Sequence, residues 1–73
     1  MQLKPGIYKH YKGKLYEVIG IGRHTETLEE IVIYRALHGT YDLWVRPLKM
    51  FCEPVVIENV LTPRFTYMQE QNQ

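Results

Sequence analysis

The segment Arg23–Gly39 (RHTETLEEIVIYRALHG) is compatible with a helix or with a loop followed by a strand, and the choice restricts the fold of the whole chain. Thr27 and Glu30 fit a capping box, and the apolar residues from 28 to 36 keep a helical spacing. Such a helix would be apolar on nearly every side, and a chain of 73 residues is too small to bury it. The β-branched and aromatic block Ile31–Tyr34 favours a pleated surface. The sequence therefore predicts a loop over residues 23–29 and a strand over 30–37.

Short β-rich segments separated by turn signals occupy the rest of the chain. Aromatic and basic residues alternate in residues 7–12 (IYKHYK), a pattern typical of an exposed edge strand. Residues 14–22 (KLYEVIGIG) contain two glycines of the kind that often mark a bulge. Residues 42–51 (DLWVRPLKMF) predict another strand, which ends at Pro47 because proline cannot donate to a ladder. Glu58-Asn59 predicts a hairpin turn between two short apolar runs.

Together these signals predict an all-β protein with little helix. Five or six short strands with brief connections are typical of a small barrel or of two packed sheets. We expect a single domain over residues 1–67 and a frayed polar tail over residues 68–73.

Composition and charge exclude several classes of protein. Nine basic and eight acidic residues give a net charge of +1, which argues against a large footprint on duplex nucleic acid. One cysteine cannot form an internal disulfide, and an unstapled small domain suits a reducing cytoplasm. No apolar run approaches the length of about 18 residues that a membrane span needs, and the N-terminus lacks the apolar centre of a signal peptide. We expect a cytoplasmic protein that does not insert into membranes.

Six sequence blocks carry a resemblance to a known family. The blocks are YKHYKG (8–13), YEV (16–18), RHTETLEE (23–30), VIYRAL (32–37), LWVRPLKMF (43–51) and PRF (63–65). In these blocks the chain is similar to the small bacterial proteins of domain-of-unknown-function family sixteen fifty-three (DUF1653). The resemblance implies a compact SH3-like β-barrel and no established activity. Glu58-Asn59 stands where the family usually has Asp-Gly, which weakens the turn signal there.

Metal binding and nucleophilic catalysis receive little support from the sequence. His10, His24, His38 and Cys52 are spaced fourteen residues apart, but no two of them have the close spacing of a zinc-ligand pair. Cys52 follows Phe51 in an apolar context, where a thiol is usually inert, and the chain contains no serine. We therefore expect no metal, no cofactor and no catalytic residues.

The alternation of the strand around Trp44 indicates a recognition surface. Leu43 and Val45 are expected in the core, which directs Trp44 and Arg46 outward on the opposite face. A Trp and an Arg exposed together can contact a ligand and hold its carboxylate or phosphate. The alternative is structural, with Arg46 stacked on Trp44 at the end of a barrel.

The remaining candidate site residues lie near turns or strand ends. Tyr8 and His10 share one strand face, and three arginines with two histidines would suit an anionic ligand. The alternative is that the arginines form ion pairs with Glu26, Glu29 and Glu30. The predicted binding residues are Tyr8, His10, Arg23, His24, Glu26, Trp44, Arg46 and Arg64.

Three functions follow from these residues. The first is a non-catalytic module, monomeric or weakly dimeric, that binds a partner protein, a peptide or a small anionic ligand. The second is a binder of single-stranded RNA or a nucleotide, with aromatic rings stacked on bases. The third is a small enzyme in which Glu26 orients His24 for acid–base chemistry, although a surface histidine bonded within its own loop explains the same pair.

The spacing of the histidines and the cysteine leads to one prediction about metal. We expect the purified protein to contain no stoichiometric zinc and a chelator to leave it folded, because no ligand pair has a workable spacing. Elemental analysis beside circular dichroism, with and without chelator, measures both. About one metal per chain, lost together with the folded signal, would contradict the prediction.

Overall fold

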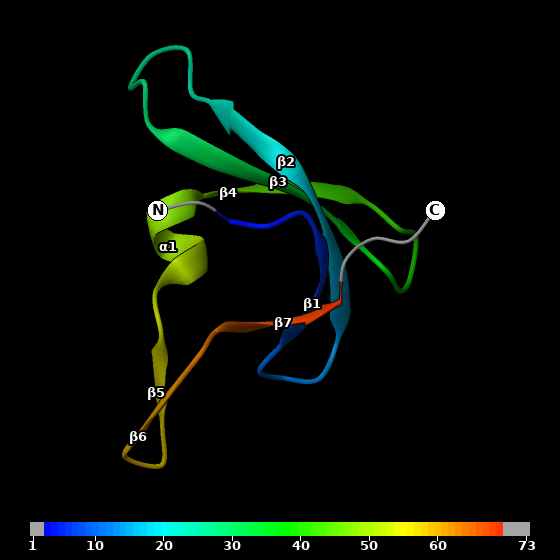
Figure 1. Ribbon diagram of the computed structural model, residues 1–73, viewed down its shortest axis with the longest axis vertical. Helices are drawn as coiled ribbons and strands as arrows, with labels where there is room; N and C mark the ends of the chain where they lie inside the picture. Colours follow the sequence, from blue (N-terminus) through cyan, green and yellow to red (C-terminus); the bar gives the residue numbers. More distant parts are fainter. Residues whose placement is uncertain (1–2, 70–73) are drawn as a thin grey trace.

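The longest hairpin of the fold pairs β2 (Leu15–Arg23) with β3 (Glu30–Ala36), and the loop between them lies at the top of Figure 1. The computed structural model describes residues 3–69, which form seven strands and one short helix. The predicted loop and strand after residue 23 are therefore confirmed. The other elements are β1 (Gly6–His10), β4 (Leu43–Pro47), α1 (Leu48–Cys52), β5 (Val55–Ile57), β6 (Val60–Thr62) and β7 (Phe65–Gln69).

Five of the strands form one antiparallel sheet in the order β4-β3-β2-β1-β7, and β5 and β6 form a separate hairpin (Figure 1). The prediction of a mostly β protein with little helix is confirmed, with seven strands instead of five or six. Within residues 3–69, β4 and β7 remain the two edges of the sheet and do not pair. The predicted SH3-like barrel is therefore not confirmed. In the chain, α1 and the β5–β6 hairpin lie between these two edge strands.

The helix α1 corrects the prediction that residues 42–51 form one strand. The strand ends at Pro47 as expected, but the chain then turns into a helix. Pro47 is the N-cap residue, where its missing N–H costs nothing. Leu48 and Phe51, three residues apart, lie on the same side of this helix, and both are buried. One apolar pair is too little periodicity to reveal a helix of five residues from the sequence.

Two further predictions at the ends of the chain are wrong. β1 was expected at an exposed edge, but it pairs with β2 on one side and β7 on the other. The alternation of basic residues there therefore does not mark an edge. Met68 and Gln69 were assigned to the tail but belong to β7. Residues 70–73 of the expected tail lie outside the described residues.

The bulge and the hairpin turn predicted from the sequence are both present. The register between β2 and β3 shifts between Val18 and Gly20, which makes Ile19 the extra residue of a bulge. Glu58 and Asn59 have φ angles of 50° and 66°. Two successive positive φ angles are typical of the type I′ turn that joins tightly paired strands.

The core lies on one face of the five-stranded sheet, beneath α1. It brings together Tyr8 from β1, Val18 from β2, Val32 and Tyr34 from β3, and Leu48 and Phe51 from α1. The Phe51 ring stacks on that of Phe65 in β7 with 4.0 Å between centroids and 2° between planes. This stack attaches the helix to the far edge of the sheet.

The burial of Phe51 leads to a prediction about stability. Phe51→Ala should lower the free energy of unfolding by about 3–5 kcal/mol, because it leaves a cavity among the rings of Tyr8, Tyr34 and Phe65. Urea unfolding followed by circular dichroism measures the loss. Val56→Ala is the matched control, since Val56 is exposed in the β5–β6 hairpin and should change stability by about 0.5 kcal/mol or less. Equal losses in the two variants would show that α1 is not part of the cooperative core.

Candidate functional site

The register of β4 corrects the predicted orientation of Trp44 and Arg46. These residues lie opposite Tyr34 and Val32, which are buried in the core. Directly opposed residues of an antiparallel pair project from the same face of the sheet, so Trp44 and Arg46 lie on the core side. Leu43 and Val45, predicted in the core, lie on the other face and are 53% and 65% exposed. Because β4 is an edge strand, its core-side face is only partly covered, and Trp44 is still 52% exposed.

Arg46 is held in place by a residue of the core. Its Nε donates a hydrogen bond of 3.2 Å to the hydroxyl oxygen of Tyr34. Arg46 does not stack on Trp44, because the cation–π contacts among residues 3–69 are made by Lys4 with Tyr67 and by Lys12 with Tyr11. The guanidinium is therefore positioned by a buried tyrosine and not by the exposed indole.

His10 ends β1 on the same face of the sheet. It lies opposite Phe65, with 5.0 Å between ring centroids, and its Nδ1 accepts a hydrogen bond from the backbone N–H of Lys12. The pKa of His10 is lowered from its ordinary value of 6.5, first by partial burial and then by the charges of Lys12, Arg46 and Arg64. The three side chains are linked through two rings: Arg46 bonds to Tyr34, whose ring contacts that of Phe65, and Phe65 contacts His10 and follows Arg64 in the chain. We call His10, Arg46 and Arg64 the basic cluster.

The backbone around Arg64 is bonded to the end of β1 and to the residue that follows it. The backbone carbonyl of Arg64 accepts from the N–H of Tyr11 at 2.9 Å. Its Nε lies 3.4 Å from the carbonyl oxygen of Glu53, a long hydrogen bond. Arg64 thus enters the site immediately before β7, while Arg46 enters from β4.

Aromatic rings lie beside the basic cluster. Tyr16 makes edge contacts with His10, Tyr34 and Phe65 at centroid distances of 6.2, 5.6 and 5.7 Å. His38 packs edge-on against Tyr16 at 5.3 Å, and its Nε2 is buried without a hydrogen-bond partner in the described residues. His38 was predicted only as a residue that binds no metal. Nothing in its local sequence indicates that it packs beside Tyr16.

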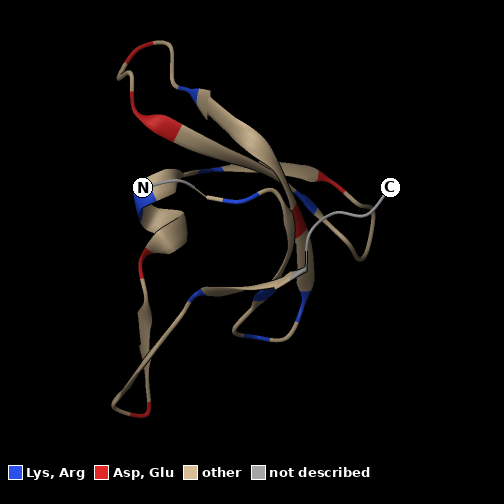
Figure 2. Ribbon diagram, in the orientation of Figure 1, with Lys and Arg blue, Asp and Glu red and all other residues tan. Residues whose placement is uncertain are grey.

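The arginines of the predicted site do not form the expected ion pairs with glutamates. Arg46 donates to a hydroxyl, and Arg23 and Arg64 donate to the carbonyl oxygens of Leu28 and Glu53. Basic segments occur in the β1–β2 turn and before β7, whereas the acidic residues of the β2–β3 loop lie at the top of the view (Figure 2). The basic cluster and these carboxylates therefore occupy different ends of the sheet.

Tyr8 has a structural position that excludes the predicted contact with a ligand. It is 5% exposed, and its hydroxyl donates a 2.7 Å hydrogen bond to the carbonyl of Lys4. Partial burial raises its pKa, with further contributions from Tyr67 and Cys52. The prediction of Tyr8 as a surface residue is wrong, because β1 is an interior strand whose core-side residues are covered.

The loop residues of the predicted site lie away from the basic cluster. Arg23 is the last residue of β2. The first residue of β2, Leu15, pairs with Lys9, the neighbour of His10, so Arg23 and His10 lie near opposite ends of β2. The Arg23 guanidinium donates to the Leu28 carbonyl at 2.7 Å and so closes the loop. The Nδ1 of His24 accepts from the backbone N–H groups of Glu26 and Thr27. His24 is therefore bonded to the Glu26 backbone, and the two side chains do not form the predicted acid–base pair.

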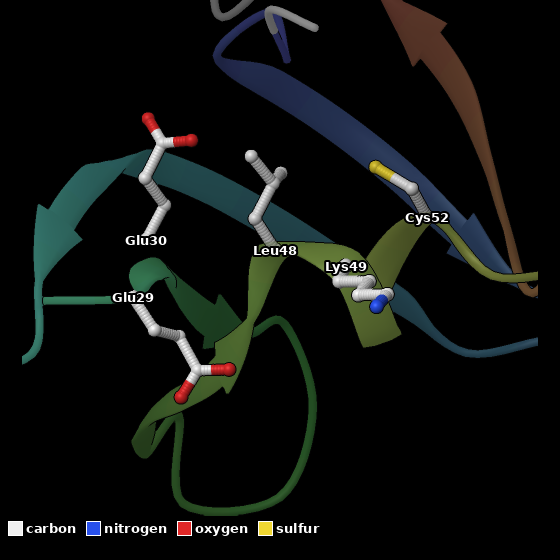
Figure 3. A pocket seen from close by; sticks show the side chains of 5 residues that line it. All are labelled: Glu29, Glu30, Leu48, Lys49 and Cys52. Carbon is white, nitrogen blue, oxygen red and sulfur yellow. The ribbon is translucent and has the colours of Figure 1, made fainter. Parts of the chain in front are cut away.

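A pocket of about 370 Å³ lies between the start of β3 and α1 (Figure 3). None of its residues was predicted as a site residue, because α1 was not predicted. Burial raises the pKa of the Cys52 thiol, which disfavours the thiolate. Among residues 3–69, no three histidine, cysteine, aspartate or glutamate side chains gather as metal ligands. The pocket is lined by Glu29, Glu30, Leu48, Lys49 and Cys52.

Comparison with known proteins places this arrangement in a family. Residues 6–67 match the family model DUF1653, described as a protein of unknown function. The chain belongs to the DUF1653 family. A crystal structure of a DUF1653 protein from Bordetella bronchiseptica superposes with a TM-score of 0.86 at 32% identity, covering 99% of this chain and 95% of that one. No curated protein matches the chain.

The DUF1653 resemblance predicted from the sequence blocks is therefore confirmed, and it supplies a fold without an activity. The described residues include no helix long and apolar enough to cross a membrane.

The lowered pKa of His10 leads to a prediction that tests the geometry of the cluster. Arg46→Gln or Arg64→Gln should raise the pKa of His10 toward 6.5, because each removes a nearby positive charge. An NMR titration of the His10 ring signals measures the shift. Arg23→Gln, at the other end of β2, is the control and should leave the His10 pKa unchanged. A His10 pKa that none of these variants moves would contradict the cluster.

The same shift sets the direction of the pH dependence of stability. Since the folded-state pKa of His10 lies below 6.5, the unfolded chain binds the proton more readily. The contribution of neutral His10 to the free energy of unfolding is therefore fully present above the ordinary histidine pKa of 6.5. It is lost as the pH falls through the lower pKa of His10 in the folded state. Urea unfolding of the wild type and of His10→Gln across this range measures the difference.

Proposed function

We propose that this DUF1653 chain is a binding module that holds an anionic group of its ligand, a carboxylate or a phosphate, at the basic cluster. The observation that carries the proposal is that His10 from β1, Arg46 from β4 and Arg64 just before β7 are linked through the rings of Tyr34 and Phe65. In residues 3–69 no glutamate or aspartate carboxylate is bonded to either arginine, since Arg46 bonds to a hydroxyl and Arg64 to a backbone carbonyl. Cations gathered in this way repel one another, and an anion between them relieves the repulsion.

The hydrogen bonds of the two arginines favour recognition of an anion. Each guanidinium uses Nε for its bond within the protein. The terminal nitrogens are then the donors left for a ligand, and their forked geometry suits a carboxylate or a phosphate. Anchoring through Nε also reduces the side-chain entropy that a ligand must restrict.

His10 supports the same function through its tautomer. Its Nδ1 accepts the N–H of Lys12, so the neutral ring carries its proton on Nε2 and can donate from there. A bound anion favours the charged imidazolium and raises the pKa of His10, although protonation of Nδ1 gives up the hydrogen bond from Lys12. Binding should therefore take up protons and become tighter as the pH falls toward the histidine range.

The aromatic rings around the basic cluster favour a ligand with a planar or apolar part next to its anionic group. Tyr16 and Phe65 are half-buried, and Trp44 is exposed on the same face as Arg46. Such rings offer contact area to a planar or apolar part of a ligand. A short peptide with a free carboxylate fits this description. A nucleotide or a single-stranded RNA is the second candidate, favoured by the exposed Trp44 as a stacking platform.

Binding measurements on arginine variants test the proposal. The probes are inorganic phosphate, a nucleoside monophosphate, a short single-stranded RNA and short peptides. NMR chemical shifts and calorimetry measure the binding of each probe. Arg46→Gln and Arg64→Gln should each weaken binding about 10–100-fold, the loss expected for a charge-assisted hydrogen bond. Arg23→Gln is the matched control and should bind as the wild type does. Stability should fall by no more than about 1 kcal/mol in Arg46→Gln.

The outcomes separate the candidates. Binding of the nucleotide and the RNA but not of the peptides, with a loss in Trp44→Ala, would favour the nucleic-acid ligand. Binding of the peptides with no effect of Trp44→Ala would favour the carboxylate ligand. A chain that binds none of the probes, or that loses as much affinity in Arg23→Gln as in Arg46→Gln, would overturn the proposal.

A further inference from the structure

The outer edge of β4 presents unpaired backbone groups. Among residues 3–69, β4 pairs with β3 and with no other strand. The N–H of Ala36 donates to the carbonyl of Asp42 at 3.0 Å, one step beyond the Arg35–Leu43 pair of the register. Hydrogen-bonded pairs alternate along an antiparallel ladder, so Trp44 and Arg46 also bond to β3. Leu43 and Val45 then direct their N–H and C=O groups away from β3.

The first three residues of this edge lack the features that usually prevent association of strands, whereas Arg46 and Pro47 lie at its end. Residues 43–45 carry no charge, and the β3–β4 register contains no bulge. Leu43, Trp44 and Val45 are each more than half exposed. Natural edge strands are commonly protected by lysines, prolines or bulges, and an unprotected apolar edge pairs readily with another strand.

The residues that flank the edge identify its partner. When two antiparallel copies of β4 are aligned about Trp44, Leu43 lies opposite Val45 of the second copy. Asp42 then lies opposite Arg46 of the second copy, and the reverse pair repeats the match on the other side of the axis. The register therefore joins opposite charges at both ends and apolar residues between them. A partner strand must therefore carry a basic and an acidic residue at these two positions, and a second copy of β4 with its preceding Asp42 does so.

We propose that two copies of this chain form a symmetric dimer by antiparallel pairing of their β4 strands, with Trp44 of both copies at the two-fold axis. The alternation of hydrogen-bonded and non-hydrogen-bonded residues along β4 agrees with this register. Leu43 and Val45 carry the outward-directed groups, so the two Leu43–Val45 pairs form the bonded positions. Trp44 occupies the non-bonded position, where facing side chains approach most closely. The product is a continuous ten-stranded sheet, two copies of the five-stranded one.

The dimer is inferred from the strand edge and does not rest on the proposed ligand. Arg46 belongs to both arrangements, so Asp42 of the second copy would compete with an anionic ligand for its guanidinium, whereas Asp42 and Val45 lie outside the basic cluster. Variants at Asp42 and Val45 therefore test the dimer without removing a proposed ligand contact.

Analytical ultracentrifugation over a range of concentrations measures the association. The mass should rise from 8.7 kDa toward twice that value, and the fluorescence of the single tryptophan should shift to shorter wavelength with the same midpoint. Val45→Pro should weaken the association at least about tenfold, because it removes an outward N–H that the β3 ladder does not use. Val45→Ala keeps that N–H and is the control. Circular dichroism verifies the fold of each variant.

A pair of charge variants tests the register and replaces Val45→Pro if that variant does not fold. Asp42→Lys and Arg46→Glu should each be monomeric, because each places like charges opposite one another. An equimolar mixture should form a heterodimer, in which every facing pair is again of opposite charge. A wild-type chain that stays monomeric up to about 1 mM would overturn the proposal. So would a dimer that tolerates both Val45→Pro and Asp42→Lys, since it would use another surface.

Discussion

The stack of Phe51 on Phe65 is the contact on which the arrangement of the core and of the basic cluster depends. It joins α1, which follows the edge strand β4, to β7, the opposite edge of the five-stranded sheet. Phe65 also contacts His10 and Tyr16, and its neighbour Arg64 enters the cluster. A large ring buried between a helix and a strand fixes both more firmly than any of the surface hydrogen bonds nearby. The position of the cations is therefore a result of apolar packing.

Local signals in the sequence predicted local structure correctly. The β-branched block at residues 31–34, the bulge near Gly20 and the Glu58-Asn59 turn each depend on a few neighbouring residues. The helix α1 was missed because five residues contain too little periodicity. The interior position of β1 was missed because its pairing with β7 joins opposite ends of the chain. The strand number allowed a small barrel or two packed sheets, and the family resemblance implied an SH3-like barrel, but neither determines whether the edge strands meet.

The candidate site was predicted in part. The sequence grouped Arg23, Arg46 and Arg64 with His10 and His24. Of these, Arg46 and His10 are linked through the rings of Tyr34 and Phe65, and Arg64 precedes Phe65. The alternation in LWVRP separates Trp44 and Arg46 from Leu43 and Val45, but it cannot identify the core side of an edge strand. The β3 register provides that information, since Val32 and Tyr34 are buried. Arg23, His24 and Glu26 were grouped with the site by residue type, whereas their hydrogen bonds close their own loop.

The pairing of β1 with β7 has a consequence for the order of folding. The β2–β3 and β3–β4 hairpins close short loops, whereas β1–β7 pairing closes nearly the whole chain and has a high contact order. We therefore expect the basic cluster, with His10 beside β7 and Arg64 before it, to be completed late in folding. Local release of β7 would separate these two residues. A ligand that contacted both would stabilise the pairing of the chain ends, because by mass action it would shift the equilibrium away from this opening.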